Sequence, residues 1–491
     1  MIMNLKEYPH GARVEEEGSY IAAPVTGTAG LQVIFGTAPV NLTENPEAAV
    51  NTPIVCRTMK EAQEKLGYSD DYKKYTLCQS MYASFCAFVV APVIFINVLD
   101  PEKHRKENAE KEYTVVSGQV FLEEEGVLRK SVVVKSGEET LRDTDYLLTF
   151  SDNGKLIITM VSEKAAGLAK VSITSASIAP EQVTAEDIIG GYDAETGKEY
   201  GLEVMRQVYP RTGMTAAFIM APGWSHKPEV AAVMIAKCGS INGAFMAETL
   251  IDIDTETARK HTDVEVCKKE NGYVDSHAIV LWPKVVMGGR QVYLSAAYGA
   301  MAAHMDAKND DVPNISPSNV LINAEAAVTE DGTEIFMDRQ QANMLNGIGV
   351  VTLLYEAGWR AWGNNTSAFP DTKELKDRWI NCRRVFSWIA NSLITTYHEK
   401  VDSPANYRLI ENICDSENIR LNSFVSAGKL AGGRIEYNEE ENRVENLLSG
   451  QVVFHVYIAA YTPAEDILFI LKFDPEMLKE NLTGTGTGGE S

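Results

Sequence analysis

The chain has 491 residues, of which 45% are hydrophobic and 23% are charged, so it has the composition of a folded protein with about three domains. Its 45 Lys and Arg residues against 68 Asp and Glu residues give a net charge of −23. Because nucleic acids and anionic membranes need a basic surface, this charge disfavours binding to either. Seven cysteines without a C-x-x-C pair argue against a disulfide framework or a zinc site and for a reducing compartment.

The first segments of the chain predict an arm followed by an α/β fold. Residues 1–18 hold little that can be buried, and we expect them to form an extended N-terminal arm. Residues 19–104 follow the pattern strand, helix, helix, strand, with Gly67 ending the first helix. The apolar run 81–99 is nearly long enough to cross a membrane, but Pro92 interrupts it. We interpret it as a buried helix and a buried strand, and expect a soluble protein made in the cytoplasm.

Residues 105–195 have a different pattern, because strand-like segments there are separated by turn residues. The Asp152-Asn153-Gly154 turn between two apolar segments is a strong hairpin signal. We therefore expect a small all-β domain inserted into the α/β core. From residue 196 to residue 370 helices and strands alternate again, and we expect this region to complete the core.

The C-terminal part begins with helices. One helix carries an apolar stripe with the spacing of a core-facing surface. The stripe consists of Leu375, Trp379, Cys382, Phe386, Ile389 and Leu393. Ser403 and Pro404 are expected to start a second helix, as N-cap and first helical residue, and a third helix is expected to end at Gly428.

Two strongly apolar strands are expected next, at 452–461 and 467–473, before a tail with a flexible composition. The predicted fold class is therefore α/β (α+β) and multidomain. Its parts are an N-terminal arm (1–18), an α/β core (19–104 and 196–370), an all-β insertion (105–195), a C-terminal helix-and-sheet domain (371–474) and a C-terminal arm (475–491).

No catalytic motif is complete. The segment 190–200 is similar to a phosphate-binding loop, but its glycine spacing is wrong and no hydroxyl follows Lys198, so we interpret it as a surface turn. The acidic run 436–445 lacks the spacing of a calcium loop, and a solvated hairpin is the simpler interpretation. We interpret His455 as a packed or edge histidine. We expect no enzyme activity, no cofactor and no bound metal.

Four tryptophans, Trp359, Trp362, Trp379 and Trp388, fall within 30 residues and would suit a sugar-binding groove. Trp379 lies on the helix stripe, however, which favours packing in a core. A carbohydrate-binding protein or enzyme therefore stays open as an alternative function, as does another self-assembling structural protein, such as a capsid or surface-layer subunit.

Four segments resemble the contractile tail sheath proteins of phages, phage-tail-like bacteriocins and related injection machines. They occur in the order found in that family and span nearly the whole chain. The segments are HGARVEEEGSYIAAPVTGTAGLQVIFGTAPV, LNGIGVVTLLYEAGWRAWGNNTSA, RWINCRRVFSWIANSLI and VVFHVYIAAYTPAEDILFILKF.

The resemblance implies a structural function. Subunits of such sheaths stack as hexameric rings around an inner tube, and their terminal arms add strands to sheets of neighbouring subunits. On a signal from the baseplate the sheath shortens, widens and drives the tube through a target envelope. The implied partners are other copies of the chain, a tube protein, baseplate proteins and a tail terminator. The implied location is the tail of a virion or tail-like particle, assembled in the host cytoplasm.

The resemblance also suggests where the contacts lie. The arm strand is expected at Ala12, Arg13, Val14 and Glu15, and the accepting and terminal strands at Val453, His455, Tyr457, Ile467, Phe469 and Leu471. The C-terminal domain is expected to face the tube, with Arg383, Arg384, Lys429 and Arg434 as a basic contact. The alternative for Arg383 and Arg384 is pairing with acidic residues of the same chain. The insertion is expected to face outward, and the arms are expected to hinge near Gly18 and Pro475.

Overall fold

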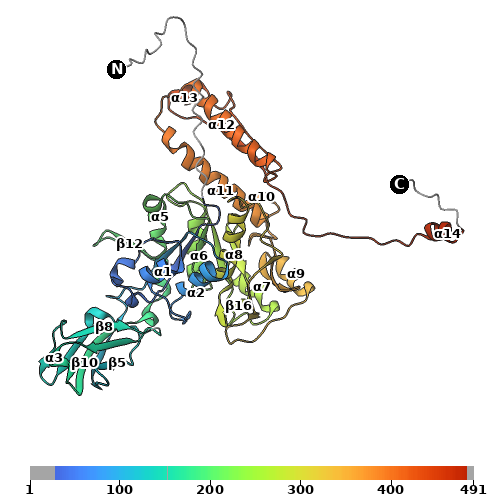
Figure 1. The fold of residues 1–491 in the computed structure, drawn as a ribbon. Helices are drawn as coiled ribbons and strands as arrows, with labels where there is room; N and C mark the ends of the chain where they lie inside the picture. The colour runs from blue at the N-terminus through green and yellow to red at the C-terminus, as the bar shows by residue number, and fades with distance from the viewer. Residues whose placement is uncertain (1–27, 152, 484–491) are drawn as a thin grey trace, which may run out of the picture. The chain divides into compact units, whose positions relative to one another are not determined.

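The computed structural model describes residues 28–151 and 153–483 (Figure 1). The predicted arm strand Ala12–Glu15 lies outside the described residues. The chain divides into two units, Met1–Tyr461 and Thr462–Ser491. The sequence placed the start of the C-terminal arm at residue 475, whereas this division falls 13 residues earlier, at Thr462.

A nine-stranded sheet forms the centre of the larger unit, in the order β18-β21-β20-β15-β14-β13-β1-β3-β2. Six neighbouring strands are parallel: β20 (Val350–Tyr355), β15 (Ala278–Leu281), β14 (Glu248–Asp252), β13 (Phe218–Met220), β1 (Gln32–Gly36) and β3 (Val93–Asn97). Antiparallel pairing completes both edges. β2 (Ile54–Cys56) pairs with β3 at one edge. At the other edge β21 (Trp359–Trp362) pairs with β20, and β18 (Val320–Leu321) pairs with β21. Every residue of β1, β3 and β14 is buried, as expected for parallel strands that are covered on both faces.

Helices cover the two faces of this sheet. Gly299 of α8 packs on Met220 and Leu250, whereas Ile251, the next residue of β14, belongs to a cluster with Ala231 of α6. Because successive side chains of a strand point to opposite faces, α8 and α6 lie on opposite sides. The helices of the α/β core are α1 (Met59–Leu66), α2 (Leu77–Tyr82), α4 (Ala185–Ile189), α5 (Met205–Thr212), α6 (Pro228–Cys238), α7 (His261–Glu270), α8 (Leu294–Lys308) and α9 (Arg339–Asn346).

Local sequence signals explain several of these elements. Thr58 caps α1 by accepting a hydrogen bond from the Glu61 N–H, and Gly67 ends the helix in the left-handed region, as predicted. The apolar run 81–99 is divided as expected, because α2 and a following π-helical turn end before Pro92 and β3 begins after it. The segment 190–200 forms a small hairpin of β11 (Gly191–Asp193) and β12 (Lys198–Tyr200).

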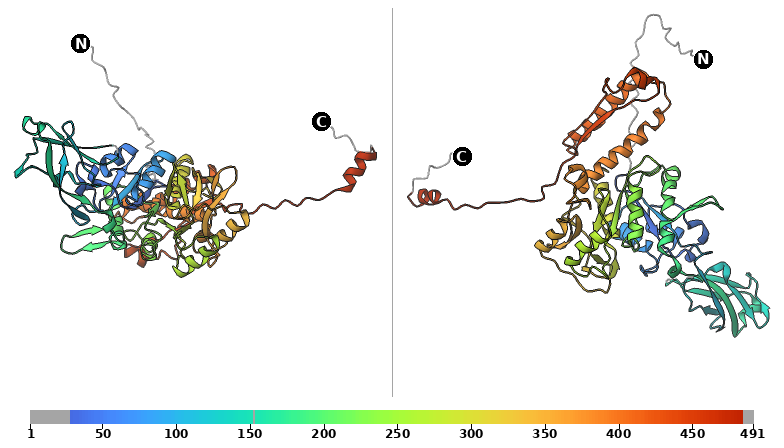
Figure 2. Two further views of the ribbon diagram at one scale, coloured as in Figure 1. Left: turned by 90° about the horizontal axis from the view of Figure 1, so that it is seen from below. Right: turned by 180° about the vertical axis from the view of Figure 1, so that it is seen from behind.

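The inserted region consists of two small antiparallel sheets around a hydrophobic cluster of its own. One sheet has the order β4-β10-β6-β7 and the other β5-β9-β8, and their strands gather together in Figure 2. The predicted hairpin is present, with β8 paired to β9 across the Asn153-Gly154 turn. The bounds are β4 (Arg105–Thr114), β5 (Gln119–Phe121), β6 (Val133–Ser136), β7 (Glu139–Thr140), β8 (Tyr146–Phe150), β9 (Leu156–Met160), β10 (Lys170–Ile178) and a short helix α3 (Glu163–Ala166).

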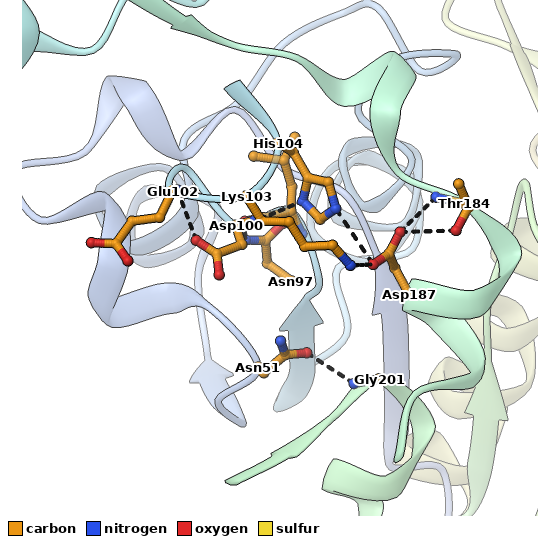
Figure 3. Close-up of polar contacts among 10 residues, drawn as sticks. Asn51, Asn97, Asp100, Glu102, Lys103, His104, Thr184, Asp187 and Gly201 are labelled. Atoms are coloured by element: carbon orange, nitrogen blue, oxygen red, sulfur yellow. Dashed lines mark hydrogen bonds and ion pairs between the residues drawn. The ribbon is translucent and has the colours of Figure 1, made fainter. Parts of the chain in front are cut away.

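The two chain segments that connect the insertion to the core are tied together by polar contacts (Figure 3). The Ala179 N–H donates to the His104 carbonyl oxygen at 2.8 Å. The His104 Nδ1 accepts from the Asp100 N–H at 3.0 Å, and its Nε2 lies 3.4 Å from Asp187 Oδ1. Lys103 forms an ion pair with the same carboxylate, whose other oxygen accepts the Thr184 N–H. The entry and exit of the insertion therefore meet at a buried histidine.

Burial lowers the pKa of His104, and nearby Lys103 lowers it further against the opposing effect of Asp187 and Asp100. The side chain is therefore neutral at pH 7, with its proton on Nε2. An unfolded histidine binds a proton near its ordinary pKa of about 6.5, before the folded one does. The contribution of His104 to stability is thus present above that pH and is lost as the pH falls toward the lowered pKa.

This histidine gives a pH prediction. His104→Asn keeps an acceptor for the Asp100 N–H but does not titrate, so the melting temperature of the variant should fall less between pH 7 and pH 5 than that of the wild type. Expressed as free energy of unfolding, the pH dependences of the two proteins should differ by at most about 1.4 kcal/mol per pH unit. Differential scanning calorimetry at pH 5, 6 and 7 measures it, and parallel declines in the two proteins would contradict the proposed role of His104.

Candidate assembly surfaces

A helix pair and a two-stranded sheet follow the α/β core. α11 (Ile380–Tyr397) and α12 (Tyr407–Ser426) run side by side in the views of Figures 1 and 2. Their shared cluster contains Trp388, Ile389 and Leu421. The remaining elements here are α10 (Leu375–Arg378), β22 (Gly432–Glu436), α13 (Val444–Leu448) and β23 (His455–Ala459).

The predicted apolar stripe is only partly right. Cys382 and Ile389 are buried in α11, as predicted, but Leu375 lies on the separate short helix α10 and is exposed. Trp379 is extended rather than helical and separates the two helices. The stripe therefore marks a single core-facing helix only from Ile380 onward.

The predicted start of the next helix is wrong. Asn406, not Ser403, is the N-cap of α12, because its side-chain oxygen accepts the Leu409 N–H at 2.9 Å. The second and third predicted helices are also one helix, which continues to Ser426. Gly428 follows it with a positive φ of 70°, the conformation that favours glycine after a helix.

The sheet β22–β23 has two strands among the described residues, with Arg434 opposite Tyr457. Gly433 lies so close to α12 that a Cβ there would be 3.1 Å from Leu421 Cβ. Asn418 of α12 accepts the Ile435 N–H at 3.0 Å, which partly covers the outer edge of β22. No strand lies beside the outer edge of β23 within the described residues. An edge of this kind is a ready template for a further strand.

The predicted accepting residues lie in and before this edge strand. His455 and Tyr457 belong to β23, and Val453 lies two residues before it. His455 is half-exposed and pairs with Glu441, which fits the interpretation as an edge histidine. The acidic run 436–445 connects β22 to α13.

The second predicted strand, 467–473, does not form within the described chain. Its apolar side chains are instead between 65% and 95% exposed: Ile467, Leu468, Phe469, Ile470, Leu471 and Phe473. The reason is that a strand needs a partner for its backbone hydrogen bonds, and no other strand of the described residues is paired with it. The predicted flexible tail also differs, because α14 (Pro475–Thr483) begins where that tail was expected.

The pattern of this segment indicates what a partner would have to provide. If the segment formed a strand, both of its faces would be apolar, with Ile467 and Phe469 on one face and Leu468 and Ile470 on the other. Strands that read as continuous apolar runs are those buried on both faces. The segment is therefore suited to a sheet that is covered on both sides.

Two of the four predicted tube-facing cations are wrongly assigned. Arg384 is 3% exposed and pairs with Asp306 of α8. Arg383 is also buried, and its Nη1 lies 3.0 Å from Asp377 Oδ1. A buried arginine has no surface to offer to a tube. The alternative that the sequence left open, pairing within the chain, is the arrangement found.

The other two cations lie nearer the surface. Lys429 Nζ is 3.1 Å from Asp310 Oδ2, and Arg434 Nε is 2.6 Å from Glu436 Oε1. The Arg434 side chain is exposed and lies over the ring of Tyr457. A tube contact by Lys429 and Arg434 stays a prediction.

The tryptophans do not form a sugar-binding surface. Trp359, Trp379 and Trp388 are buried, and Trp362 donates its indole N–H to Asn343. Within the described residues there is no group of His, Cys, Asp or Glu side chains that would hold a metal ion. Across the same residues, none of the helices has the length and apolar character of a membrane span.

Comparison with known proteins shows what the chain is similar to. The chain is 25% identical to the tail sheath protein of Burkholderia phage BcepMu over 495 residues, which cover 96% of this chain and 98% of that protein. This match confirms the resemblance to the contractile tail sheath proteins. It is also 26% identical to the tail sheath protein of Escherichia phage P2, over 62% of this chain and 74% of that protein. No protein-family model matches this chain.

Solved structures agree on the fold. The sheath complex of an extracellular contractile injection system (PVC) in its contracted state aligns with a TM-score of 0.57 and 15% identity, over 97% of this chain and all of that one. The baseplate structure of the anti-feeding prophage contains a chain that aligns with a TM-score of 0.56 and 14% identity, over 96% of this chain and all of that one. The mixed helix-and-sheet fold predicted from the sequence is thus confirmed.

The reassignment of Arg384 gives a stability prediction. Arg384→Ala leaves the buried Asp306 carboxylate without its cation, which should cost about 3–5 kcal/mol of unfolding free energy. Arg434→Ala removes only an exposed pair, which water and salt screen, so it should cost little unfolding free energy. Urea unfolding of the purified subunit measures both values. If both variants lose equally little unfolding free energy, Arg384 is not a buried ion-pair residue, and the tube contact predicted from the sequence is supported.

Proposed function

We propose that this chain is the repeating subunit of a contractile sheath, in which subunits stack as hexameric rings around an inner tube and are linked by strand exchange. The observation that carries the proposal is the coexistence of an unpaired apolar segment, 467–473, and an open sheet edge at β23 in one chain. In a polymer of identical subunits each segment has an edge to join, on a neighbouring copy.

The energetics favour such a link. Burying a large apolar side chain is worth about 1.5–3 kcal/mol, and six such side chains are exposed in the segment. Each added strand hydrogen bond contributes about 0.5–1.5 kcal/mol net. These gains oppose the entropy lost when the arm is ordered, about 1–2 kcal/mol for each residue. Apolar burial is therefore the main driving term, and backbone pairing sets the register.

The charge of the subunit constrains the assembly. A net charge of −23 makes copies of the chain repel one another at long range. Short-range apolar contacts, which salt does not weaken, must overcome this repulsion. Assembly should consequently be easier at higher ionic strength, where the repulsion is screened.

The second predicted arm, residues 1–18, would supply another link. At full extension 18 residues reach about 60 Å, far enough to cross to an adjacent subunit. With both arms paired, the folded bodies would move as rigid units while the links between them persist. Contraction, started at a baseplate, would then drive the tube through a target envelope, with body-to-body contacts supplying the free energy and no nucleotide consumed. A terminator protein would close the far end, and the all-β insertion would face outward.

Paired substitutions test the strand exchange. Phe469→Asp places a charge in the proposed donor strand, and Met477→Asp makes the same change at a similarly exposed position of α14. Neither side chain is packed within the described chain, so both variants should keep the wild-type melting temperature. By electron microscopy the Phe469 variant should form few or no polysheaths, the tubular polymers of free sheath subunits, whereas the Met477 variant should form them normally. Normal polysheaths from the Phe469 variant would contradict the proposal.

A further inference from the structure

The described chain begins at a point where the backbone is held on both sides. The Ala29 N–H donates to Asp311 Oδ1 at 3.0 Å, and the Ala29 carbonyl oxygen accepts from Arg384 Nη2 at 3.1 Å. At Gly30 a Cβ would lie 2.5 Å from the Ala303 Cα of α8, so the chain passes directly against that helix. Residues 28–30 are therefore a fixed point of attachment for the N-terminal arm, and we call them the N-terminal root.

Arg384 is itself rigidly placed. It is buried, and its Nη2 contacts both the Ala29 carbonyl and Asp306 Oδ2, while Nη1 lies 3.4 Å from Asp306 Oδ1. The guanidinium also lies over the ring of Phe218 in β13, 4.6 Å from its centroid. The arginine thus connects the N-terminal root to α8 and to the central sheet.

The C-terminal root is held by the same helix, three residues earlier. The carbonyl oxygen of Tyr461, the last residue of the larger unit, accepts from Asn381 Nδ2 at 2.9 Å. Cys382 Sγ lies 3.7 Å from the same oxygen. Asn381 is buried, and its Oδ1 accepts from Asn364 Nδ2 at 2.8 Å. The point at which the chain leaves toward Thr462 is therefore fixed as firmly as the N-terminal root.

The two roots are close together along α11. Residues three apart on an α-helix lie next to one another, about 4.5 Å apart along the axis. The helix is in turn fixed to the core, because Ser387 Oγ donates to Glu248 Oε1 at 2.6 Å and the Asn391 side chain bonds the backbone of Met246. The first turns of α11 thus hold both arm roots at a constant spacing.

We propose that Asn381 and Arg384 are positioning residues for the two arms, and that tension between subunits passes through the turn 381–384 of α11. This inference rests on the proposed function, since it assigns the path of force within a subunit that is linked by its arms. The path runs from residue 29 through Arg384, along one turn of helix, and through Asn381 to Tyr461. It does not pass through the insertion, so that part carries no tension, whereas the central sheet shares the load through Phe218 and Glu248.

The first test removes the Arg384 link without leaving a lone charge. The double variant Asp306→Leu/Arg384→Met replaces the buried ion pair with apolar side chains, an exchange that proteins often tolerate without loss of stability. In the soluble full-length subunit, peptides that cover residues 28–31 should exchange amide hydrogen at least tenfold faster than in the wild type, at a melting temperature within a few degrees of it. Unchanged exchange in a folded double variant would overturn the role of Arg384.

The second test uses a matched pair of amides. Asn381→Ala removes the donor to Tyr461. Asn365→Ala removes another buried amide nearby, whose side chain bonds Asn346 and Arg378 and not the root. Both changes should lower the melting temperature, but only Asn381→Ala should speed exchange at residues 459–462, again by about tenfold or more. Equal exchange at that root in the two variants would overturn the role of Asn381. This pair also tests the inference if the double variant does not fold.

The third test asks whether the two roots carry mechanical tension in assembled polysheaths. Wild-type polysheaths and those of the double variant and of Asn381→Ala are sheared by sonication under identical conditions, and fragment lengths are measured by electron microscopy. The two variants should break into fragments at most half as long as those of the wild type and of Asn365→Ala. Fragments of equal length would overturn the path of force. If the wild type forms no polysheaths, the proposed function fails, whereas the exchange measurements still decide whether α11 holds the two roots.

Discussion

The account of this protein depends on one feature, an exposed apolar segment that has no partner strand among the described residues. Residues 467–473 do not pair with another strand or bury their apolar side chains within the described chain. Exposed segments of this kind promote aggregation unless a specific partner takes them up. In the sheath that we propose the partner is another copy, so the property that is a hazard for a free monomer would become the bond between subunits.

The larger unit is an internally packed body from which the two arms leave. The parallel strands of the central sheet are covered on both faces, and its edges end in antiparallel strands. Polar contacts at His104 tie the insertion to the core, and buried contacts at Arg384 and Asn381 hold the two ends of the larger unit. A rigid body with held ends is the arrangement needed if neighbouring subunits are to move while they stay linked.

Signals between near neighbours in the sequence predicted much of this fold. Gly67, Pro92 and the Asn153-Gly154 turn each mark an element boundary that the structure contains, because each acts through its own backbone conformation. The start of α12 was missed because Asn406 competes with Ser403 for the same capping role, and sequence alone does not rank two good caps that are three residues apart.

Contacts between distant residues could not be predicted. The partner of Arg384 is Asp306, 78 residues away, and the root that it holds lies 355 residues away, so the sequence showed a cation but not its burial. The segment 467–473 was predicted to be a strand from its apolar pattern, but it has no partner in the described chain, and the pattern does not state which molecule would supply one. The sequence therefore predicted which segments form the candidate surfaces, but not which residues these segments contact.

A cryo-electron microscopy map of assembled polysheaths tests the central claim most directly. The account predicts that residues 467–473 of one subunit lie as an added strand beside the β22–β23 sheet of a neighbouring subunit, with backbone hydrogen bonds across the boundary. A map in which this segment is folded back onto its own subunit, with no strand exchanged between copies, would contradict the account.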